Sequence, residues 1–343
     1  MNVDMTKTKV ICLLPVKNEA WILKHFIEAA LAWADILIIG DHNSTDDSAS
    51  IARQYDRVKL ITLSNPAFDA GERRRKLLEE ARKIPGKRLI FYLDADEMLS
   101  ANWAESAEWD LMLNAPPGTN FQFESYFLLP GLEKAVIYPF ITAFTDDGSE
   151  YMGTKINEPR IPATTGQRIW LQDIKLIHYQ YIDLQRLLSR HQYYKCVDFI
   201  DAGTRPFAVC VEYQDTEIKS QGLPVVPVDE KLLKGYTWLD DFRSKRNNIE
   251  KCYWFDEEIL NYFDKYGTKR FSKINIWDVN WNKKAHLLGR QRDYPDPRSS
   301  FEVWMHKFIK QHRNELAIGQ AKENFVFWCW YIFLRVGTRI LGW

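Results

Sequence analysis

Two carboxylates stand two residues apart directly after an apolar run. The run is Leu89-Ile90-Phe91-Tyr92-Leu93, and Asp94-Ala95-Asp96-Glu97 follows it. Hard divalent cations such as Mg²⁺ and Mn²⁺ prefer carboxylate oxygens and readily take phosphate oxygens as further ligands. A cation held at such a pair can neutralise a diphosphate leaving group. A solvated acidic turn is the alternative for an isolated Asp-x-Asp, so the surrounding elements decide between the two.

Polar residues also follow two earlier apolar runs. Residues 10–16 and 36–39 are continuous apolar segments, as is typical of strands buried on both faces. Asn18 and Glu19 come after the first run, and Asp41 comes after the second. Residues 58–62 are predicted as a further strand, and helical spacing separates the strands, which predicts an α/β fold with a mostly parallel sheet flanked by helices. Ligands bind at the carboxyl ends of such strands, so we expect one pocket to collect these side chains.

Composition excludes several classes of protein. Lys+Arg and Asp+Glu both number 46, so no overall basic field favours nucleic acid as a partner. The five cysteines are scattered without a CxxC pair, so we expect reduced thiols rather than a zinc site or a disulfide framework. Residues 1–9 lack the apolar run of a signal peptide, which favours the cytoplasm.

The pattern changes twice further along the chain. Between about residues 121 and 177, short apolar and aromatic pieces alternate with glycine and proline, which predicts antiparallel strands and loops that complete the site. From residue 184 onward helical spacing dominates and aromatic residues are frequent. We therefore predict an α/β domain over 1–220 and a mainly helical, aromatic-rich extension over 221–343, with a Pro-containing linker at 222–228.

The chain closes on an apolar, basic segment. Residues 325–334 are unbroken apolar sequence. A helix needs about 20 apolar residues to span a bilayer, so this run is too short to do so. Basic residues lie on both sides of it: Lys307, Lys310, Arg313, Lys322, Arg335 and Arg339. We predict that 322–343 contacts the inner face of the cytoplasmic membrane peripherally. A buried helix and a contact between copies in a homo-oligomer are the alternatives.

Three ordered segments resemble the motifs of family 2 glycosyltransferases with the GT-A fold. They are Pro15-Val16-Lys17-Asn18-Glu19, Asp41-His42-Asn43-Ser44-Thr45-Asp46 and Asp94-Ala95-Asp96-Glu97. The resemblance covers roughly the first hundred residues and continues more weakly to about residue 195. It implies a Rossmann-like nucleotide-binding sheet, a nucleotide-sugar donor, Mn²⁺ or Mg²⁺ as cofactor, and transfer to an acceptor hydroxyl with inversion.

The resemblance also implies which residues bind the donor. Asp41 matches the acid that hydrogen-bonds the base, and Asp94 matches the residue near the donor sugar and ribose. Arg74 falls near an arginine that contacts the nucleotide, and Arg73 or Arg75 could take its place. The donor-binding residues implied at matching positions are Pro15, Val16, Asn18, Glu19, Asp41, Asn43, Arg74, Asp94 and Ala95.

Metal and base are implied in the same way. Asp96 matches the direct metal ligand, and His178 lies in a segment where GT-A enzymes often place a histidine on the metal or diphosphate. Glu158 belongs to Asn157-Glu158-Pro159-Arg160, which resembles a His-Glu element and offers a general base; a salt bridge to Arg160 is the structural alternative. Asp147, with its neighbour Asp146, is the second candidate for the base.

We therefore expect a metal-dependent glycosyltransferase that acts on a glycan or lipid-linked acceptor in cell-surface glycan or glycolipid synthesis. A nucleotidyltransferase is one alternative, but its glycine-rich phosphate loop is replaced by Lys17-Asn18-Glu19 after the first strand. A non-catalytic scaffold that binds nucleotide sugars is the other.

Overall fold

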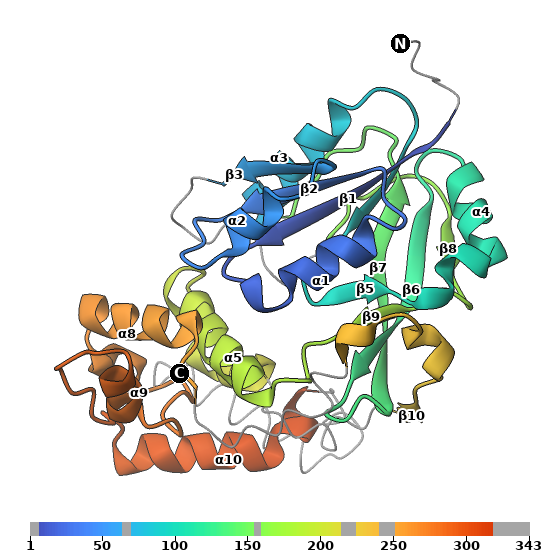
Figure 1. Ribbon diagram of the computed structural model, residues 1–343. Helices are drawn as coiled ribbons and strands as arrows, with labels where there is room; N and C mark the ends of the chain where they lie inside the picture. The colour runs from blue at the N-terminus through green and yellow to red at the C-terminus, as the bar shows by residue number, and fades with distance from the viewer. Residues whose placement is uncertain (1–6, 64–69, 154–158, 214–223, 240–250, 318–343) are drawn as a thin grey trace. The chain divides into compact units, whose positions relative to one another are not determined.

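The computed structural model describes residues 7–63, 70–153, 159–213, 224–239 and 251–317 (Figure 1). Contacts divide the chain into two compact units. The first consists of the described parts of Met1–Ile182 and Pro224–Arg246, and the second of those of Asp183–Leu223 and Asn247–Trp343.

The first unit begins with the four strands that the apolar runs predict. These are β1 (Lys9–Val16), β2 (Ile36–Asp41), β3 (Val58–Thr62) and β4 (Arg88–Tyr92). They are parallel and lie in the order β3-β2-β1-β4. In the register Val16 lies beside Asp41, and Asp41 lies beside Thr62. The carboxyl ends of these strands therefore share one edge, as predicted.

Helices cover both faces of this sheet because β1, β2 and β4 are largely buried on both faces. The helix α1 (Ala20–Ala30) packs its buried residues with Cys12 and Leu14, while α3 (Ala70–Arg82) packs Leu77 against Ile11 and Leu13 (Figure 1). Successive residues of a strand point to opposite faces, so β1 supplies both cores. The short α2 (Ser48–Ala52) connects β2 to β3.

Antiparallel pairing enters with the strands after β4. After β4 the sheet continues in the order β7 (Lys134–Thr145), β6 (Asn120–Leu128), β9 (Leu176–His178) and β5 (Glu97–Leu99). In addition, β8 (Arg168–Trp170) pairs with β6, and β10 (Val225–Pro227) pairs with β7. The long β7 is antiparallel to both β4 and β6. The remaining elements here are η1 (Ala101–Glu105) and α4 (Ala107–Asn114). The result is the mixed α/β sheet expected for residues 7–178.

The second unit is helical and rich in aromatic residues, as predicted. Its helices are α5 (Leu184–Ile200), α6 (Pro206–Glu212), α8 (Trp254–Tyr266), η5 (Thr268–Phe271), α9 (Trp281–Leu287) and α10 (Ser300–Ala317). Phe263 stands at the centre of the core and packs against the rings of Phe271, Trp277 and Trp281.

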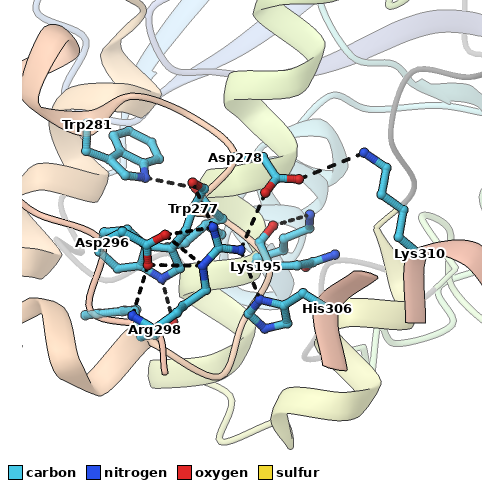
Figure 2. Close-up of polar contacts among 11 residues, drawn as sticks. Lys195, Trp277, Asp278, Trp281, Asp296, Arg298, His306 and Lys310 are labelled. Atoms are coloured by element: carbon cyan, nitrogen blue, oxygen red, sulfur yellow. Dashed lines mark hydrogen bonds and ion pairs between the residues drawn. The ribbon is translucent and has the colours of Figure 1, made fainter. Parts of the chain in front are cut away.

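One arginine fastens the segment before α10 to the rest of this unit. The Nη2 atom of Arg298 lies 2.8 Å from Asp296 Oδ2 and 3.2 Å from the carbonyl oxygen of Trp277, and Nη1 lies 3.3 Å from His306 Nδ1 (Figure 2). The Arg298 side chain is only 9% exposed. Because its donors are occupied by acceptors of this unit, we regard the cluster as structural.

The boundary between the units differs from the predicted one at residues 220 and 221. The helix α5 belongs to the second unit, where it packs on α8. Residues 224–239 return to the first unit instead of linking two domains, because β10 (Val225–Pro227) pairs with β7 and the Trp238 ring stacks on His25 at 4.7 Å. Two short 3-10 helices follow β10, η3 (Glu230–Leu233) and η4 (Thr237–Leu239).

The buried carboxylate of Asp146 gives a test of the sheet. Its side chain is 1% exposed and accepts hydrogen bonds from Arg82 Nη2 at 2.8 Å and Arg88 Nε at 3.0 Å. Burial by itself raises the pKa of Asp146, but the hydrogen bonds from Arg82, Gly148 and Arg88 outweigh burial and lower this pKa. The folded-state pKa therefore lies below the unfolded one, so the stabilisation is present at neutral pH and lost as pH falls through the folded pKa.

We expect Asp146→Asn to lower the free energy of unfolding at pH 7 by about 2 kcal/mol, because two partly buried arginines lose their counter-charge. Urea unfolding at pH 7 and at steps below about pH 4 measures this, and the difference from the natural sequence should shrink with acidity. Asp56→Asn, at an exposed turn, is the control and should change little. A difference that is unchanged at low pH would contradict the assigned role of the charge.

Candidate functional site

The ends of β1 and β2 are joined by side chains of the first two motifs. The backbone of Asn18 has a φ of 56°, in the left-handed region that asparagine tolerates better than most residues. Its Oδ1 atom accepts hydrogen bonds from Thr45 N at 2.7 Å and Asp46 N at 3.3 Å, and its own N–H donates to Ser44 Oγ at 2.9 Å. Asn18 is therefore largely engaged in shaping the loop after β2.

That loop presents Asp41 at the edge of the sheet. The Asp41 residue is 9% exposed, and its carboxylate accepts the N–H of Ser44 at 3.3 Å. The next residue but one, Asn43, also has a positive φ of 53° and is exposed. The two carboxylate oxygens of Asp41 make only long contacts within the loop, which leaves their acceptor capacity for a ligand.

The other donor-site candidates of the first motif divide into core and edge. Val16 is 1% exposed and belongs to the core, so its side chain does not face a ligand. Pro15 and Glu19 are partly exposed, and Glu19 Oε2 accepts the indole N–H of Trp21 at 2.7 Å. Ala95, in the third motif, is 3% exposed and also packs into the core. The residues Val16 and Ala95 can thus offer only backbone atoms.

Arg74 lies in α3 and reaches the end of β4. Its guanidinium is 5.7 Å from the ring centroid of Tyr92, and Nη1 donates to the Tyr151 hydroxyl at 2.7 Å. Burial raises the pKa of Tyr92 to about 12 although the charge of Arg74 opposes this. The neighbouring Arg75 donates instead to the carbonyl oxygen of Gly153 at 3.1 Å. Arg74 therefore lies beside the last residue of β4.

The third motif forms a tight turn that two hydrogen bonds between its first and last residues close. The N–H of Glu97 donates to the carbonyl oxygen of Asp94 at 3.0 Å, and the N–H of Asp94 donates back to Glu97 Oε2 at 2.9 Å. Arg160 bridges both ends, with Nη1 2.5 Å from Glu97 Oε2 and Nη2 2.8 Å from Asp94 Oδ2. Burial disfavours the Arg160 cation, but the carboxylates of Asp94 and Glu97 outweigh it and raise its pKa.

Asp96 and His178 meet beside this turn. The N–H of Tyr179 donates to the carbonyl oxygen of Asp96 at 2.8 Å, which holds β9 against the turn. The Nε2 atom of His178 lies 3.5 Å from Asp96 Oδ1, and both residues are largely buried, at 5% and 7% exposure. The structure therefore brings these two predicted site residues close together.

These two side chains fit a divalent cation as its protein ligands. A carboxylate oxygen and an imidazole nitrogen at this separation can approach one ion, and Mn²⁺ and Mg²⁺ accept both or complete their shell with phosphate and water. Within residues 7–317 as described, no group of three His, Cys, Asp or Glu side chains is arranged as metal ligands. Phosphate oxygens of a donor would therefore have to supply much of the coordination.

Comparison with known proteins identifies one family model. Residues 12–107 match the model described as Glycosyl transferase family 2, and the match includes all three motifs. A comparison with curated proteins finds no match.

Solved structures resemble smaller parts of the chain. One is glucosyl-3-phosphoglycerate synthase from Mycobacterium tuberculosis in complex with Mn²⁺, uridine diphosphate and phosphoglyceric acid, with 18% identity, 35% of this chain, 43% of that chain and a TM-score of 0.26. Another is 4-diphosphocytidyl-2C-methyl-D-erythritol synthase, with 16% identity, 40% of this chain, 73% of that chain and a TM-score of 0.25. The chain thus spans less than half the length of the first of these.

The two candidate bases, Glu158 and Asp147, have different outcomes in the structure. Asp147 follows β7, which runs antiparallel to β4, and the N–H of Asp146 donates to the carbonyl oxygen of Arg88 at the start of β4. Six residues of extended chain, about 20 Å, separate Arg88 from Asp94. Asp147 and Asp146 therefore lie at the opposite edge from the third motif, and the structure does not bring them to the site. Glu158 lies outside the described residues.

Two residues of the candidate site have no role that the sequence predicts. Glu97 stands in the sequence only as the last residue of the acidic motif, yet it is completely buried, and Arg160 is expected only as a partner for Glu158. A signal for Glu97 exists in hindsight, because an acidic residue that opens the apolar pair Met98-Leu99 in a buried strand requires a partner. No local pattern identifies Arg160, whose partners are more than sixty residues away.

The left-handed Asn18 gives a prediction for the nucleotide side of the site. We expect Asn18→Ala to lower the free energy of unfolding by about 2–3 kcal/mol, from the lost hydrogen bonds to the loop and from forcing alanine to a positive φ. Asn18→Gly also removes the hydrogen bonds but tolerates this φ, so it should recover about 1 kcal/mol of the loss. Urea unfolding compares the two variants. Equal destabilisation would show that the backbone conformation contributes nothing.

Proposed function

We propose that the protein is a metal-dependent glycosyltransferase that moves a sugar from a nucleotide-sugar donor to an acceptor hydroxyl. The observation that carries the proposal is the approach of His178 to Asp96, in the turn after β4 that also holds Asp94 and that lies within the match to the family 2 model. Asp41 lies at the same edge, at the end of β2. This edge combines acceptors for a nucleoside with ligands for a cation.

The nucleoside of the donor would lie at the ends of β1 and β2. Asp41 accepts a hydrogen bond from the base, and Asn18 holds the loop that carries Asp41 in place. Arg74, which lies beside the last residue of β4, would contribute positive charge at the diphosphate. Asp94 is 44% exposed in spite of its ion pair with Arg160, so its second oxygen is accessible to a ribose or sugar hydroxyl.

Asp96 and His178 would hold Mn²⁺ or Mg²⁺ at the diphosphate. A cation bound there neutralises negative charge that develops on the leaving nucleoside diphosphate. The two residues belong to different segments, the turn before β5 and the end of β9, and the hydrogen bond from Tyr179 to Asp96 fixes one segment on the other. The protein therefore orients the leaving group before the acceptor arrives.

Glu158 is our candidate for the base that takes the acceptor proton. It precedes Arg160 by two residues, so chain connectivity keeps the two Cα atoms within about 7 Å of each other. Arg160 itself is bound to Asp94 at the donor edge. A base on the acceptor side, opposite the diphosphate, gives in-line attack on the anomeric carbon and inversion of configuration.

The cation ligand gives the decisive test of the activity. We expect Asp96→Ala to reduce Mn²⁺-dependent hydrolysis or transfer from a panel of UDP and GDP sugars by at least about a hundredfold, because the diphosphate loses its cation. Exposed Asp56→Asn is the matched control. Full metal-dependent activity of Asp96→Ala would refute this site. Absence of binding to every nucleotide sugar in calorimetry would favour a scaffold, and release of pyrophosphate from a nucleoside triphosphate would favour a nucleotidyltransferase.

The acceptor is proposed to be a glycan or a lipid-linked glycan at the membrane surface, as in cell-surface glycan synthesis. Support comes from α10, where Phe301 and Trp304 are 47% and 52% exposed and their rings stack in a row with Phe308. The exposed charged residues beside this row are Lys307 and Lys310. Aromatic rings flanked by lysine favour the headgroup region of anionic lipid. The predicted contact segment 322–343 lies outside the described residues.

None of the helices described for residues 7–317 is both long and apolar enough to cross a bilayer. Contact through α10 would therefore be peripheral in this part of the chain.

A vesicle assay tests the contact through α10. We expect Trp304→Ser to weaken flotation with phosphatidylcholine vesicles containing phosphatidylglycerol by about tenfold, since a large ring no longer leaves water. Trp170→Ser removes an equally exposed tryptophan of β8, at 53%, and should leave flotation unchanged. Equal flotation of Trp304→Ser and the natural sequence would exclude this face. A dimer that dissociates on Trp304→Ser would assign the face to a second copy of the chain.

A further inference from the structure

Glu97 is a carboxylate without solvent in the first unit. It is 0% exposed, and transfer of an ionised carboxylate out of water is costly unless the charge is paired and hydrogen-bonded. One oxygen, Oε2, is satisfied by the N–H of Asp94 and by Arg160. The other oxygen, Oε1, has no hydrogen-bond partner among the residues that the structure describes. The hydrogen bonds that Oε2 accepts therefore do not explain the position of Oε1.

The imidazole of His178 approaches this oxygen. Strands β5 and β9 are antiparallel, and their register sets Glu97 opposite His178. The Nδ1 atom of His178 lies 3.5 Å from Glu97 Oε1, and it too lacks another hydrogen-bond partner in the described part of the chain. The opposite ring nitrogen, Nε2, lies 3.5 Å from Asp96 Oδ1. One imidazole thus stands between two adjacent carboxylates, with one nitrogen toward each.

The ring has little freedom to turn away from this arrangement. His178 is 5% exposed, and its ring centroid lies 4.4 Å from that of Phe127 on the neighbouring strand β6. Arg160 fixes Glu97 from the other side and itself packs 5.1 Å from the Phe140 ring centroid. A small rotation of the buried Glu97 carboxyl would convert the 3.5 Å approach into a hydrogen bond.

We propose that Glu97 is a positioning residue that orients His178 toward the cation. Its Oε1 accepts a hydrogen bond from Nδ1–H of His178, which leaves the lone pair of Nε2 directed to the ion beside Asp96. Histidines that bind metals commonly donate their other N–H to a carboxylate, which fixes both the tautomer and the ring orientation. Arg160 completes the chain by holding Glu97. This inference rests on the proposed cation site at Asp96.

The first measurement is the affinity for Mn²⁺ alone, with free Mn²⁺ followed by electron paramagnetic resonance. We expect Glu97→Gln to weaken binding by about tenfold to a hundredfold, the usual effect of removing such an outer partner. Glu124→Gln is the matched control, because Glu124 is a carboxylate of the same sheet paired with Lys175 at 2.5 Å, and it should bind as the natural sequence does. Glu97→Gln binding with unchanged affinity, while Asp96→Ala binds weakly, would overturn the inference alone.

The second measurement needs no variant of Glu97. In the natural sequence labelled with ¹⁵N-histidine, the long-range ¹H–¹⁵N spectrum without metal should show His178 with its proton on Nδ1, and His178→Gln identifies the signal. A proton on Nε2 would overturn the inference even if Glu97→Gln fails to fold. If the natural sequence and Asp96→Ala bind Mn²⁺ equally weakly, the proposed cation site fails and this inference fails with it.

Discussion

The buried charge of Glu97 is the constraint on which the arrangement of the candidate site depends. A carboxylate in a core must be surrounded by donors, and these donors come from different parts of the chain. The backbone of Asp94, the guanidinium of Arg160 and the approach of His178 meet at this one side chain. The end of β4, the segment at residue 160 and the end of β9 are therefore held together by a single group that does not itself face solvent.

The nucleotide side of the site is held by a separate device. The side-chain oxygen of Asn18 accepts hydrogen bonds from backbone N–H groups of the loop after β2. These bonds hold that loop to the end of β1. No hydrogen bond or ion pair described for Asn18 involves Glu97 or Arg160. Because no contact described for Asn18 joins the two clusters, the proposed base recognition at Asp41 and the proposed cation binding at Asp96 should be separable by mutation.

Sequence reasoning succeeded where short-range pattern determines structure. Apolar runs predicted β1 to β4, and the polar residues after them predicted the shared edge, because parallel strands end together. The position of Asp147 could not be predicted, because the sequence does not reveal that β7 is antiparallel to β4. The residues after β7 therefore lie at the edge of the sheet opposite the third motif. The partners of Glu97 could not be predicted either, since a pairing such as Glu97 with His178 depends on a register between distant strands. The predicted boundary at residue 220 is wrong for the same reason, because β10 pairs with β7, which lies nearly ninety residues earlier in the chain.

The return of residues 224–239 to the first unit has a consequence for the synthesis of the chain. β10 covers part of the edge of β7, and the hydroxyl of Tyr236 donates to the carbonyl oxygen of Leu99. A ribosome must therefore translate α5 and α6 of the second unit before the first unit can be completed. Until then the nascent sheet has an uncovered strand edge, which is the feature that invites pairing with other chains. The order of synthesis therefore alternates between the two units.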